Sequence, residues 1–137
     1  MAYVELDARL TDAQVVRLVA LTRDVDRTPG GGSRIVPLVD VPVDVQAFLE
    51  QACGRWVAVR VVALLASQQL VGHTDPPVRA RRIHIPIRLN AGCWVFSAGT
   101  WQQLEEGRCY EMDPTQVHGA VNWGAETRLH LMIDTEL

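Results

Sequence analysis

Lysine is absent from this sequence. All 13 basic side chains are arginine, and 16 aspartates and glutamates outnumber them, so the formal net charge is −3 and the isoelectric point is about 5.7. An acidic chain offers no broad basic surface that would follow a phosphate backbone or an anionic membrane. We therefore expect neither a nucleic acid nor a membrane as a partner.

Cysteine is scarce and shows no pairing pattern. The three cysteines, Cys53, Cys93 and Cys109, are odd in number and include no Cys-x-x-Cys pair. This pattern excludes a disulfide framework and a zinc knuckle, and it favours a reducing compartment. We expect Cys93 and Cys109 to be small buried residues.

Long apolar runs are missing as well. No stretch approaches 18 consecutive apolar residues, and the first residues show no charged segment followed by an apolar one. We therefore expect a cytoplasmic protein. The glycine-rich stretch "DRTPGGGSR" (26–34) lacks the Gly-Lys-Ser/Thr of a phosphate-binding loop, so it predicts a linker.

Two helices are predicted in the first part of the chain. Between residues 11 and 23, valines and leucines recur on one helical face, and Thr11 is the expected N-cap. A second helix is predicted over residues 44–53, with Asp44 as its cap and Gly54 as its stop.

From residue 55 onwards the pattern changes. Residues 55–66 are rich in β-formers, although their leucines and alanines leave a helix open for part of this stretch. The segments that follow alternate between apolar and polar residues with period two, are separated by turn residues, and cover residues 81–89, 93–98, 107–113, 116–122 and 127–134. Several short strands at this spacing predict a sandwich or small barrel. We therefore expect a mainly β single domain over residues 1–137, with a helical cover at 1–54 and a β-barrel core at 55–137.

Two arrangements of the strand faces are open. In "RIHIPI" (82–87), the isoleucines share one face, whereas Arg82 and His84 share the other, and "RLHLMID" (128–134) repeats the pattern. The polar face can be solvated, as in an ordinary half-buried sheet. Alternatively, the apolar faces pack against the helices and the polar faces line the barrel. Burying these polar side chains without water or a partner costs free energy, so such a barrel interior must hold a metal, an anion or water.

Three residues suggest a metal centre. His73 and Asp75 are two positions apart, so on a strand both side chains project from one face. His118 is the candidate for a third ligand. Two imidazoles and one carboxylate leave three coordination positions open, which suits non-haem iron(II) that binds a co-substrate and dioxygen together. Zinc favours a closed tetrahedral site and magnesium more oxygen ligands.

Arg128 is the candidate for binding an organic co-substrate. Its planar guanidinium suits the distal carboxylate of a dicarboxylate whose 2-oxo acid end chelates the metal. Arg82 and His84 face the same predicted interior and can donate further hydrogen bonds to the bound acid. A solvated turn is the alternative for Arg82, because Arg79 and Arg81 adjoin it.

From His73 onwards the chain resembles the aspartyl/asparaginyl β-hydroxylase family. This family belongs to the iron(II)- and 2-oxoglutarate-dependent dioxygenases and includes free-proline hydroxylases. The matching segments are, in chain order, "HTD" (73–75), "RIHIPI" (82–87), "TWQQLEEGR" (100–108), "VHGAVN" (117–122) and "RLHLMID" (128–134). Their order and spacing are more specific than any one motif.

The resemblance implies a double-stranded β-helix, that is, a jelly-roll or cupin-like barrel. It implies iron(II) at the three predicted ligands, His73, Asp75 and His118, and 2-oxoglutarate bound by Arg128 with help from His84 and Arg82. Some animal members of the family lack the carboxylate ligand, whereas Asp75 is present here. No catalytic side chain is expected beyond the metal ligands.

The expected activity is hydroxylation of a C–H bond of an amino acid, free or within a peptide, with dioxygen as the oxidant. One alternative is a cupin-like module that binds a metal or small acid without turnover. Another is a nucleic-acid-modifying oxygenase, which the acidic balance disfavours. The sequence leaves the oligomeric state open.

Three tryptophans, Trp94, Trp101 and Trp123, lie within the predicted barrel segments or their turns. A role in stacking on the substrate is conceivable. We expect packing in the core or against a hairpin instead, because tryptophan fills barrel ends well.

Overall fold

The computed structural model describes residues 3–25, 33–75 and 80–136. Neither helix in these ranges is long and apolar enough to cross a membrane. The elements, in chain order, are β1 (Val4–Arg9), α1 (Asp12–Thr22), β2 (Ser33–Pro37), α2 (Val43–Cys53), β3 (Trp56–Leu64), β4 (Gln68–His73), β5 (Ala80–Arg88), β6 (Cys93–Ser97), β7 (Thr100–Gln102), β8 (Arg108–Met112), β9 (His118–Asn122) and β10 (Arg128–Glu136).

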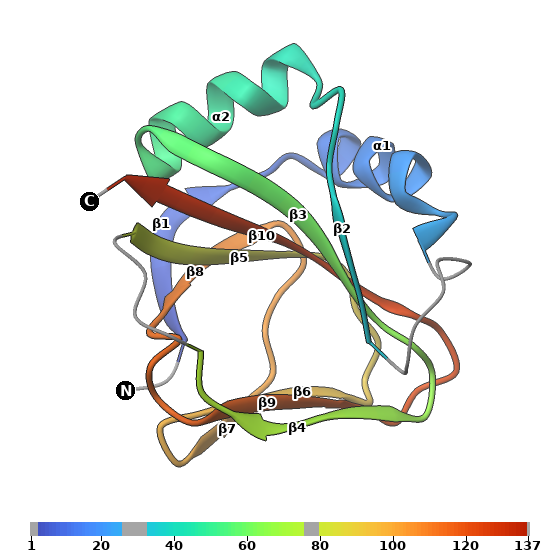
Figure 1. The fold of residues 1–137 in the computed structure, drawn as a ribbon. Helices are drawn as coiled ribbons and strands as arrows, with labels where there is room; N and C mark the ends of the chain where they lie inside the picture. The colour runs from blue at the N-terminus through green and yellow to red at the C-terminus, as the bar shows by residue number, and fades with distance from the viewer. Residues whose placement is uncertain (1–2, 26–32, 76–79, 137) are drawn as a thin grey trace.

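The strands form two sheets that face each other. The larger sheet has six strands in the order β1-β8-β5-β10-β3-β2, and the smaller has four in the order β4-β9-β6-β7. Every pairing is antiparallel. Figure 1 shows the two sheets as opposite walls. This is the double-stranded β-helix that the family resemblance implies, and the expected fold class is confirmed.

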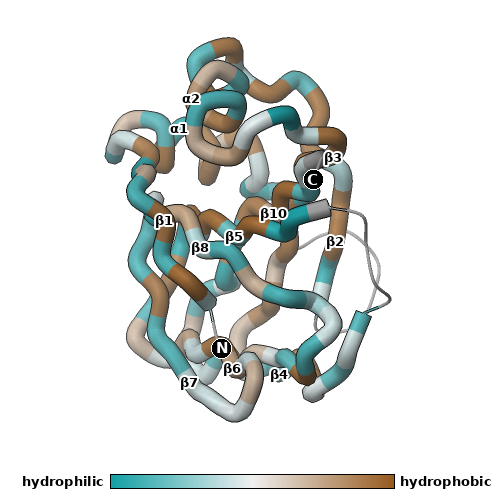
Figure 2. The backbone as a smooth tube through the Cα atoms, turned by 90° about the vertical axis from the view of Figure 1, so that its left-hand side faces the viewer, coloured by the Kyte–Doolittle hydropathy of each residue, from teal (hydrophilic) through white to brown (hydrophobic). Residues whose placement is uncertain are grey.

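Both helices lie on the outer face of the six-stranded sheet, as Figures 1 and 2 show from two directions. The main core fills the space between helices and sheet. It contains Leu18 of α1 and Val45 and Leu49 of α2, packed with the apolar sides of β5 and β10: Ile83, Ile85, Ile87, Leu129, Leu131 and Ile133. Of the two arrangements open from the sequence, the one with apolar faces toward the helices is therefore correct.

The two helices begin in different ways. At α1 the expected cap is present, because the Thr11 hydroxyl accepts from the Gln14 backbone N–H at 3.1 Å and the Gln14 side chain accepts from the Thr11 N–H at 2.9 Å. The expected cap of α2 is wrong. Pro42 occupies the N-cap position, and the Asp44 carboxylate instead bonds to Gln14 and Arg17 of α1. Asp44 therefore joins the helices to each other.

Residues 1–54 contain two strands that the sequence pattern does not predict, and β7 is a third. Both β1 and β2 are edge strands of the six-stranded sheet. Each is short and partly exposed. The partner of β1 is β8, about a hundred residues further along the chain. Strand β2 begins at Ser33, inside the predicted linker, and the rest of that linker lies outside the described residues.

The three tryptophans lie on the outside of the smaller wall. Trp94, Trp101 and Trp123 are 38%, 52% and 61% exposed, so the expected core packing is wrong. Trp101 does pack against a hairpin neighbour, since its ring centroid lies 5.2 Å from that of Phe96 across β6 and β7. The expectation that Cys93 and Cys109 are buried is confirmed.

Leu131 tests the core between helices and sheet. Its side chain is fully buried, opposite Val61 on one side and Ile85 on the other. We expect Leu131→Ala to lower the free energy of unfolding by about 2–5 kcal/mol, because the substitution leaves a cavity that the two neighbouring strands prevent from collapsing. Urea denaturation monitored by circular dichroism measures this change. The control is Val16→Ala on the exposed face of α1, expected within about 0.5 kcal/mol of the parent. Equal losses in the two variants would contradict this description of the core.

Candidate metal centre

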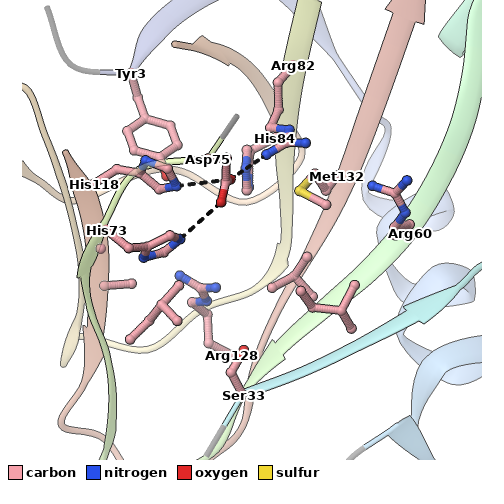
Figure 3. Close-up of a pocket in the computed structure, with 15 residues that line it drawn as sticks. Tyr3, Ser33, Arg60, His73, Asp75, Arg82, His84, His118, Arg128 and Met132 are labelled. Carbon is pink, nitrogen blue, oxygen red and sulfur yellow. Dashed lines mark hydrogen bonds and ion pairs between the residues drawn. The ribbon is translucent and has the colours of Figure 1, made fainter. Parts of the chain in front are cut away.

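The three predicted ligands lie together at one end of the four-stranded sheet. His73 ends β4 and His118 begins β9, and the two residues are directly opposite each other in the antiparallel ladder. Asp75 follows His73 by two residues. One ligand atom from each side chain can be chosen so that all three lie within 4.8 Å of one another. Figure 3 shows the three side chains converging on one point.

Both imidazoles are oriented by their own backbone. The Nδ1 atom of His73 lies 2.8 Å from the carbonyl oxygen of Val71, and that of His118 lies 2.8 Å from the carbonyl oxygen of Gln116. Because a carbonyl only accepts, each Nδ1 carries a hydrogen, and in the neutral ring the lone pair is then on Nε2. The two Nε2 atoms lie 3.7 and 3.4 Å from the Asp75 carboxylate. This is the tautomer that a metal ligand requires.

Asp75 is held at its backbone and at its side chain. The Asp75 backbone N–H donates to the carbonyl of Pro114 at 2.9 Å, which fixes the chain beyond the end of β4. The Asp75 carboxylate accepts from Arg82 Nη1 at 2.7 Å. Arg82 Nε donates to Asp134 at 3.0 Å, and Asp134 also accepts from Arg60 at 3.1 Å. A chain of alternating charges therefore runs from the candidate ligand to Arg60.

A close approach of β4 and β9 aligns the two histidines. The pairing of these strands is irregular between Leu70 and His73. Gly119 follows His118 at this irregularity, and a Cβ atom there would stand 2.6 Å from the carbonyl oxygen of Leu70. Only glycine allows the strands to approach so closely. The Gly after the histidine in "VHGAVN" therefore has a structural reason within the site.

A cavity of about 460 Å³ opens beside the three side chains. This volume falls in the ordinary range for a small-molecule site. The cavity is lined by all six residues predicted from the sequence: His73, Asp75, Arg82, His84, His118 and Arg128. The structure thus brings the whole predicted set together, although Arg82 is already bonded to two carboxylates.

Arg128 is a buried cation with spare hydrogen-bonding capacity. Its Nε atom is buried and has no hydrogen-bond partner among the described residues. Burial lowers its pKa below the ordinary value, yet a guanidinium stays charged at neutral pH. A buried charge without a paired anion is costly. The position therefore calls for an anionic ligand.

His84 and His130 form a buried pair beside Arg128. Their Nδ1 atoms are 3.2 Å apart, so one donates and the other accepts. Burial, reinforced by Arg128, lowers the pKa of His84 to about 3 and that of His130 well below its ordinary value, so both rings are neutral. His130 Nε2 has no partner among the described residues. A hydrogen on His130 Nε2 would therefore be a buried N–H without a partner, so we place the hydrogen of His130 on Nδ1, where it is donated to His84 Nδ1. His84 Nδ1 is then the acceptor, and the hydrogen of His84 is on Nε2.

Nine further described residues line the cavity, and three of them, Tyr3, Arg60 and Met132, bear on its chemistry. Tyr3, just before β1, is buried with its ring edge-on to His84 at 5.5 Å between centroids, and burial raises its pKa to about 12. No sequence signal singles it out, because it stands outside every predicted element. Arg60 carries a signal, as a lone charge within the valine-rich strand β3. Met132 shares the inner face of β10 with Arg128.

Fold and site together define a class of protein. It is a double-stranded β-helix that presents two histidines and one carboxylate to a cavity with a buried arginine. The aspartyl/asparaginyl beta-hydroxylase family matches residues 39–136, well over half of the chain, and the protein belongs to this family. The resemblance seen in the sequence is thereby confirmed. Family membership points to a 2-oxoglutarate-dependent oxygenase.

Solved structures share the fold at low sequence identity. The viral collagen prolyl hydroxylase of Paramecium Bursaria Chlorella virus-1, solved with 2OG, has a TM-score of 0.69 and 12% identity, covering 100% of this chain and 97% of that one. The non-heme alpha ketoglutarate dependent epimerase SnoN from nogalamycin biosynthesis has a TM-score of 0.67 and 17% identity, covering 98% and 78%. The non-heme monooxygenase ThoJ, in a nickel complex, has a TM-score of 0.66 and 14% identity, covering 97% and 72%. No curated protein matches the chain.

Gly119 tests whether the strand approach aligns the histidines. In Gly119→Ala, the new methyl group meets the Leu70 carbonyl, so β4 and β9 must separate and His73 moves away from His118. We expect cobalt(II) binding, followed by its visible absorption, to weaken by about tenfold or more. The matched control is Gly72→Ala, where the methyl group meets only a Val117 side-chain carbon at 3.4 Å. Unchanged cobalt(II) affinity in a folded Gly119→Ala protein would contradict this role.

Proposed function

We propose that the protein is an iron(II)- and 2-oxoglutarate-dependent hydroxylase that acts on a C–H bond of an amino acid, free or within a peptide. The observation that carries the proposal is the convergence of two imidazole Nε2 atoms and one carboxylate beside a buried arginine that lacks an anion. The family match supports the reaction class. The choice of iron, the ligand roles and the substrate are parts of the proposal.

The donor set fits iron(II). His73, Asp75 and His118 would hold the metal through two nitrogens and one oxygen, and the cavity opens beside them. Three protein ligands would leave coordination positions for other molecules. A closed zinc site would need a fourth protein ligand, and among the described residues only these three histidine, cysteine or acidic side chains cluster in this way.

The cavity also fits 2-oxoglutarate. Arg128 would bind the distal carboxylate through its planar guanidinium, which would supply the missing partner of the buried charge. His84, neutral with its hydrogen on Nε2, would donate a further hydrogen bond to the bound acid. The apolar residues Val62, Leu70 and Ala120 line the same cavity and exclude water from it. When bound, iron and 2-oxoglutarate supply the oxidation: the substrate C–H and dioxygen become C–OH, while 2-oxoglutarate becomes succinate and carbon dioxide.

Spectroscopy with the intact protein tests this proposal. Without oxygen, iron(II) and 2-oxoglutarate together should give a weak visible charge-transfer band. We expect His118→Ala to abolish the band, because one of the three ligands is lost. We expect Arg128→Gln to keep iron binding but to raise the 2-oxoglutarate concentration needed for the band by roughly a hundredfold, since a buried charge-assisted contact is lost.

The absence of a band in the parent protein would contradict the proposal, and equal losses of metal and co-substrate in Arg128→Gln would contradict the division of roles. Succinate release under oxygen then separates an oxygenase from a cupin-like binding module. A module that only binds would give the band without succinate for any amino acid or peptide tested.

Arg82 has a different role in this proposal from the one expected from the sequence. Both of its bonded nitrogens contact carboxylates, and its side chain is nearly buried between Asp75 and Asp134. We propose that Arg82 positions the Asp75 ligand rather than binding 2-oxoglutarate. Its charge also offsets that of the Asp75 carboxylate inside the cavity.

The test compares two adjacent arginines. In Arg82→Gln, Asp75 loses its partner, so we expect cobalt(II) affinity to fall about tenfold with a smaller change in 2-oxoglutarate affinity. Arg82→Lys should recover part of the loss. The control is Arg81→Gln, which breaks only the 2.6 Å ion pair with Glu111 on the opposite face. A selective loss of 2-oxoglutarate binding in Arg82→Gln would restore the original expectation.

A further inference from the structure

The charges around the cavity are not balanced. Of the described residues that line it, three are arginines, Arg60, Arg82 and Arg128, and one, Asp75, is a carboxylate. Asp134 adds a second carboxylate, bonded to both Arg60 and Arg82. If the proposed function holds, the charge of a divalent metal and that of 2-oxoglutarate cancel. One positive charge then remains for the substrate to neutralise.

Arg60 is the arginine that can receive this charge. Arg128 is buried beside the proposed co-substrate, and Arg82 already has a carboxylate on each side. Arg60 uses only Nη1, in its bond to Asp134, and its other donors have no partner among the described residues. Its side chain is 37% exposed, so Arg60 stands at the mouth of the cavity, where an arriving molecule can reach it.

The sheet register places Arg60 at a defined position relative to the site. Met132 of β10 is opposite Arg60 of β3 on one side and opposite His84 of β5 on the other, so the three form a row on one face. Two strand spacings, about 10 Å, separate the backbones of Arg60 and His84. In Figure 3, Met132 lies between the metal triad and Arg60.

Apart from the ion pairs through Asp134 and Arg82, the cavity wall beside Arg60 is apolar. Val62 follows Arg60 on the same face of β3, and Ile35 of the edge strand β2 is opposite Val62. Both line the cavity together with Met132. A ligand that reaches from the triad to Arg60 would therefore meet this hydrocarbon along its length and would place an anion at its far end.

Nothing among the described lining residues matches a substrate ammonium group. The two carboxylates near the cavity, Asp75 and Asp134, are both bonded to Arg82. A free neutral amino acid would bring an unmatched ammonium group and no net charge. An amino acid whose nitrogen is acylated brings one carboxylate and a net charge of −1.

We infer that Arg60 binds the carboxylate of the substrate, and that the substrate is an N-acylated amino acid or the C-terminal residue of a peptide, with its apolar part over Met132. This inference rests on the proposed function and narrows its substrate to molecules with a free carboxylate and no free amino group.

Matched sets of three compounds test the inference: an N-acetyl amino acid, its amide and the free amino acid, for a range of apolar side chains. Binding is measured without oxygen, from the change in the visible band of the complex with iron(II) and 2-oxoglutarate. We expect at least one N-acetyl amino acid to bind roughly tenfold to a hundredfold more tightly than both its amide and its free counterpart. Succinate release under oxygen should follow the same order.

Arg60→Gln should remove the preference for the carboxylate and leave the band itself intact, because Arg60 contacts neither the triad nor Arg128. Arg60→Lys keeps the charge and should keep part of the preference. The control is Arg9→Gln, which removes an equal charge from β1, where Arg9 forms an exposed ion pair with Glu105.

Free amino acids binding as tightly as their N-acetyl forms would overturn the inference, as would a full preference in Arg60→Gln or a panel in which no N-acetyl amino acid changes the band. In each of these cases the band is present and the proposed function stands. A parent protein that gives no band overturns both.

Discussion

The antiparallel register of β4 and β9 is the constraint on which the site depends. It sets His73 opposite His118, and it holds only because Gly119 lets the Leu70 carbonyl approach. The backbone then orients each imidazole through its Nδ1 hydrogen, and the bond from Asp75 to Pro114 brings in the carboxylate. Ligand geometry is thus set mainly by main-chain contacts, which vary less than side-chain rotamers. A shift of one residue would turn either histidine to the outer face.

A second constraint is the cost of a charged interior. The inner face of the six-stranded sheet carries arginines and histidines where most sheets bury hydrocarbon. The helices cover the opposite face and supply the main apolar core, so the inner face does not have to carry the stability of the fold. Its own charges are matched in part by Asp75 and Asp134, and its buried histidines are neutral. The positive charge of Arg128 has no anionic partner among the described residues, so it is available to bind a ligand.

Much of this could be predicted because it follows local rules. Period-two alternation identifies which residues of β5 and β10 share a face. The two ligands of "HTD" do lie together, but β4 ends at His73 and the bond from the Asp75 N–H to Pro114 holds the carboxylate in place. The edge strands β1 and β2 are short and partly exposed, and β1 pairs with a strand about a hundred residues away, so the local pattern does not identify them. Tyr3 lies just before β1 and is missed with it. The tryptophans fail for another reason. Side-chain size suggests burial, but Trp94 and Trp101 lie on the outward face of their strands, and no helix or sheet of the described residues covers that face of the smaller sheet.

Alternation identifies a face, but it gives no position along that face. Arg82 shows the difference, because the same inward orientation suits a contact with 2-oxoglutarate or with Asp75, and only the fold shows the carboxylates on both sides. The row formed by Arg60, Met132 and His84 requires the registers of two ladders at once. One of these, between β10 and β5, is irregular between Leu129 and His130, so counting residues from the turn would misplace the row. The residue types at the site can therefore be predicted from the sequence. The different roles of Arg60, Arg82 and Arg128 cannot, because they depend on the pairing of strands that are distant in the chain.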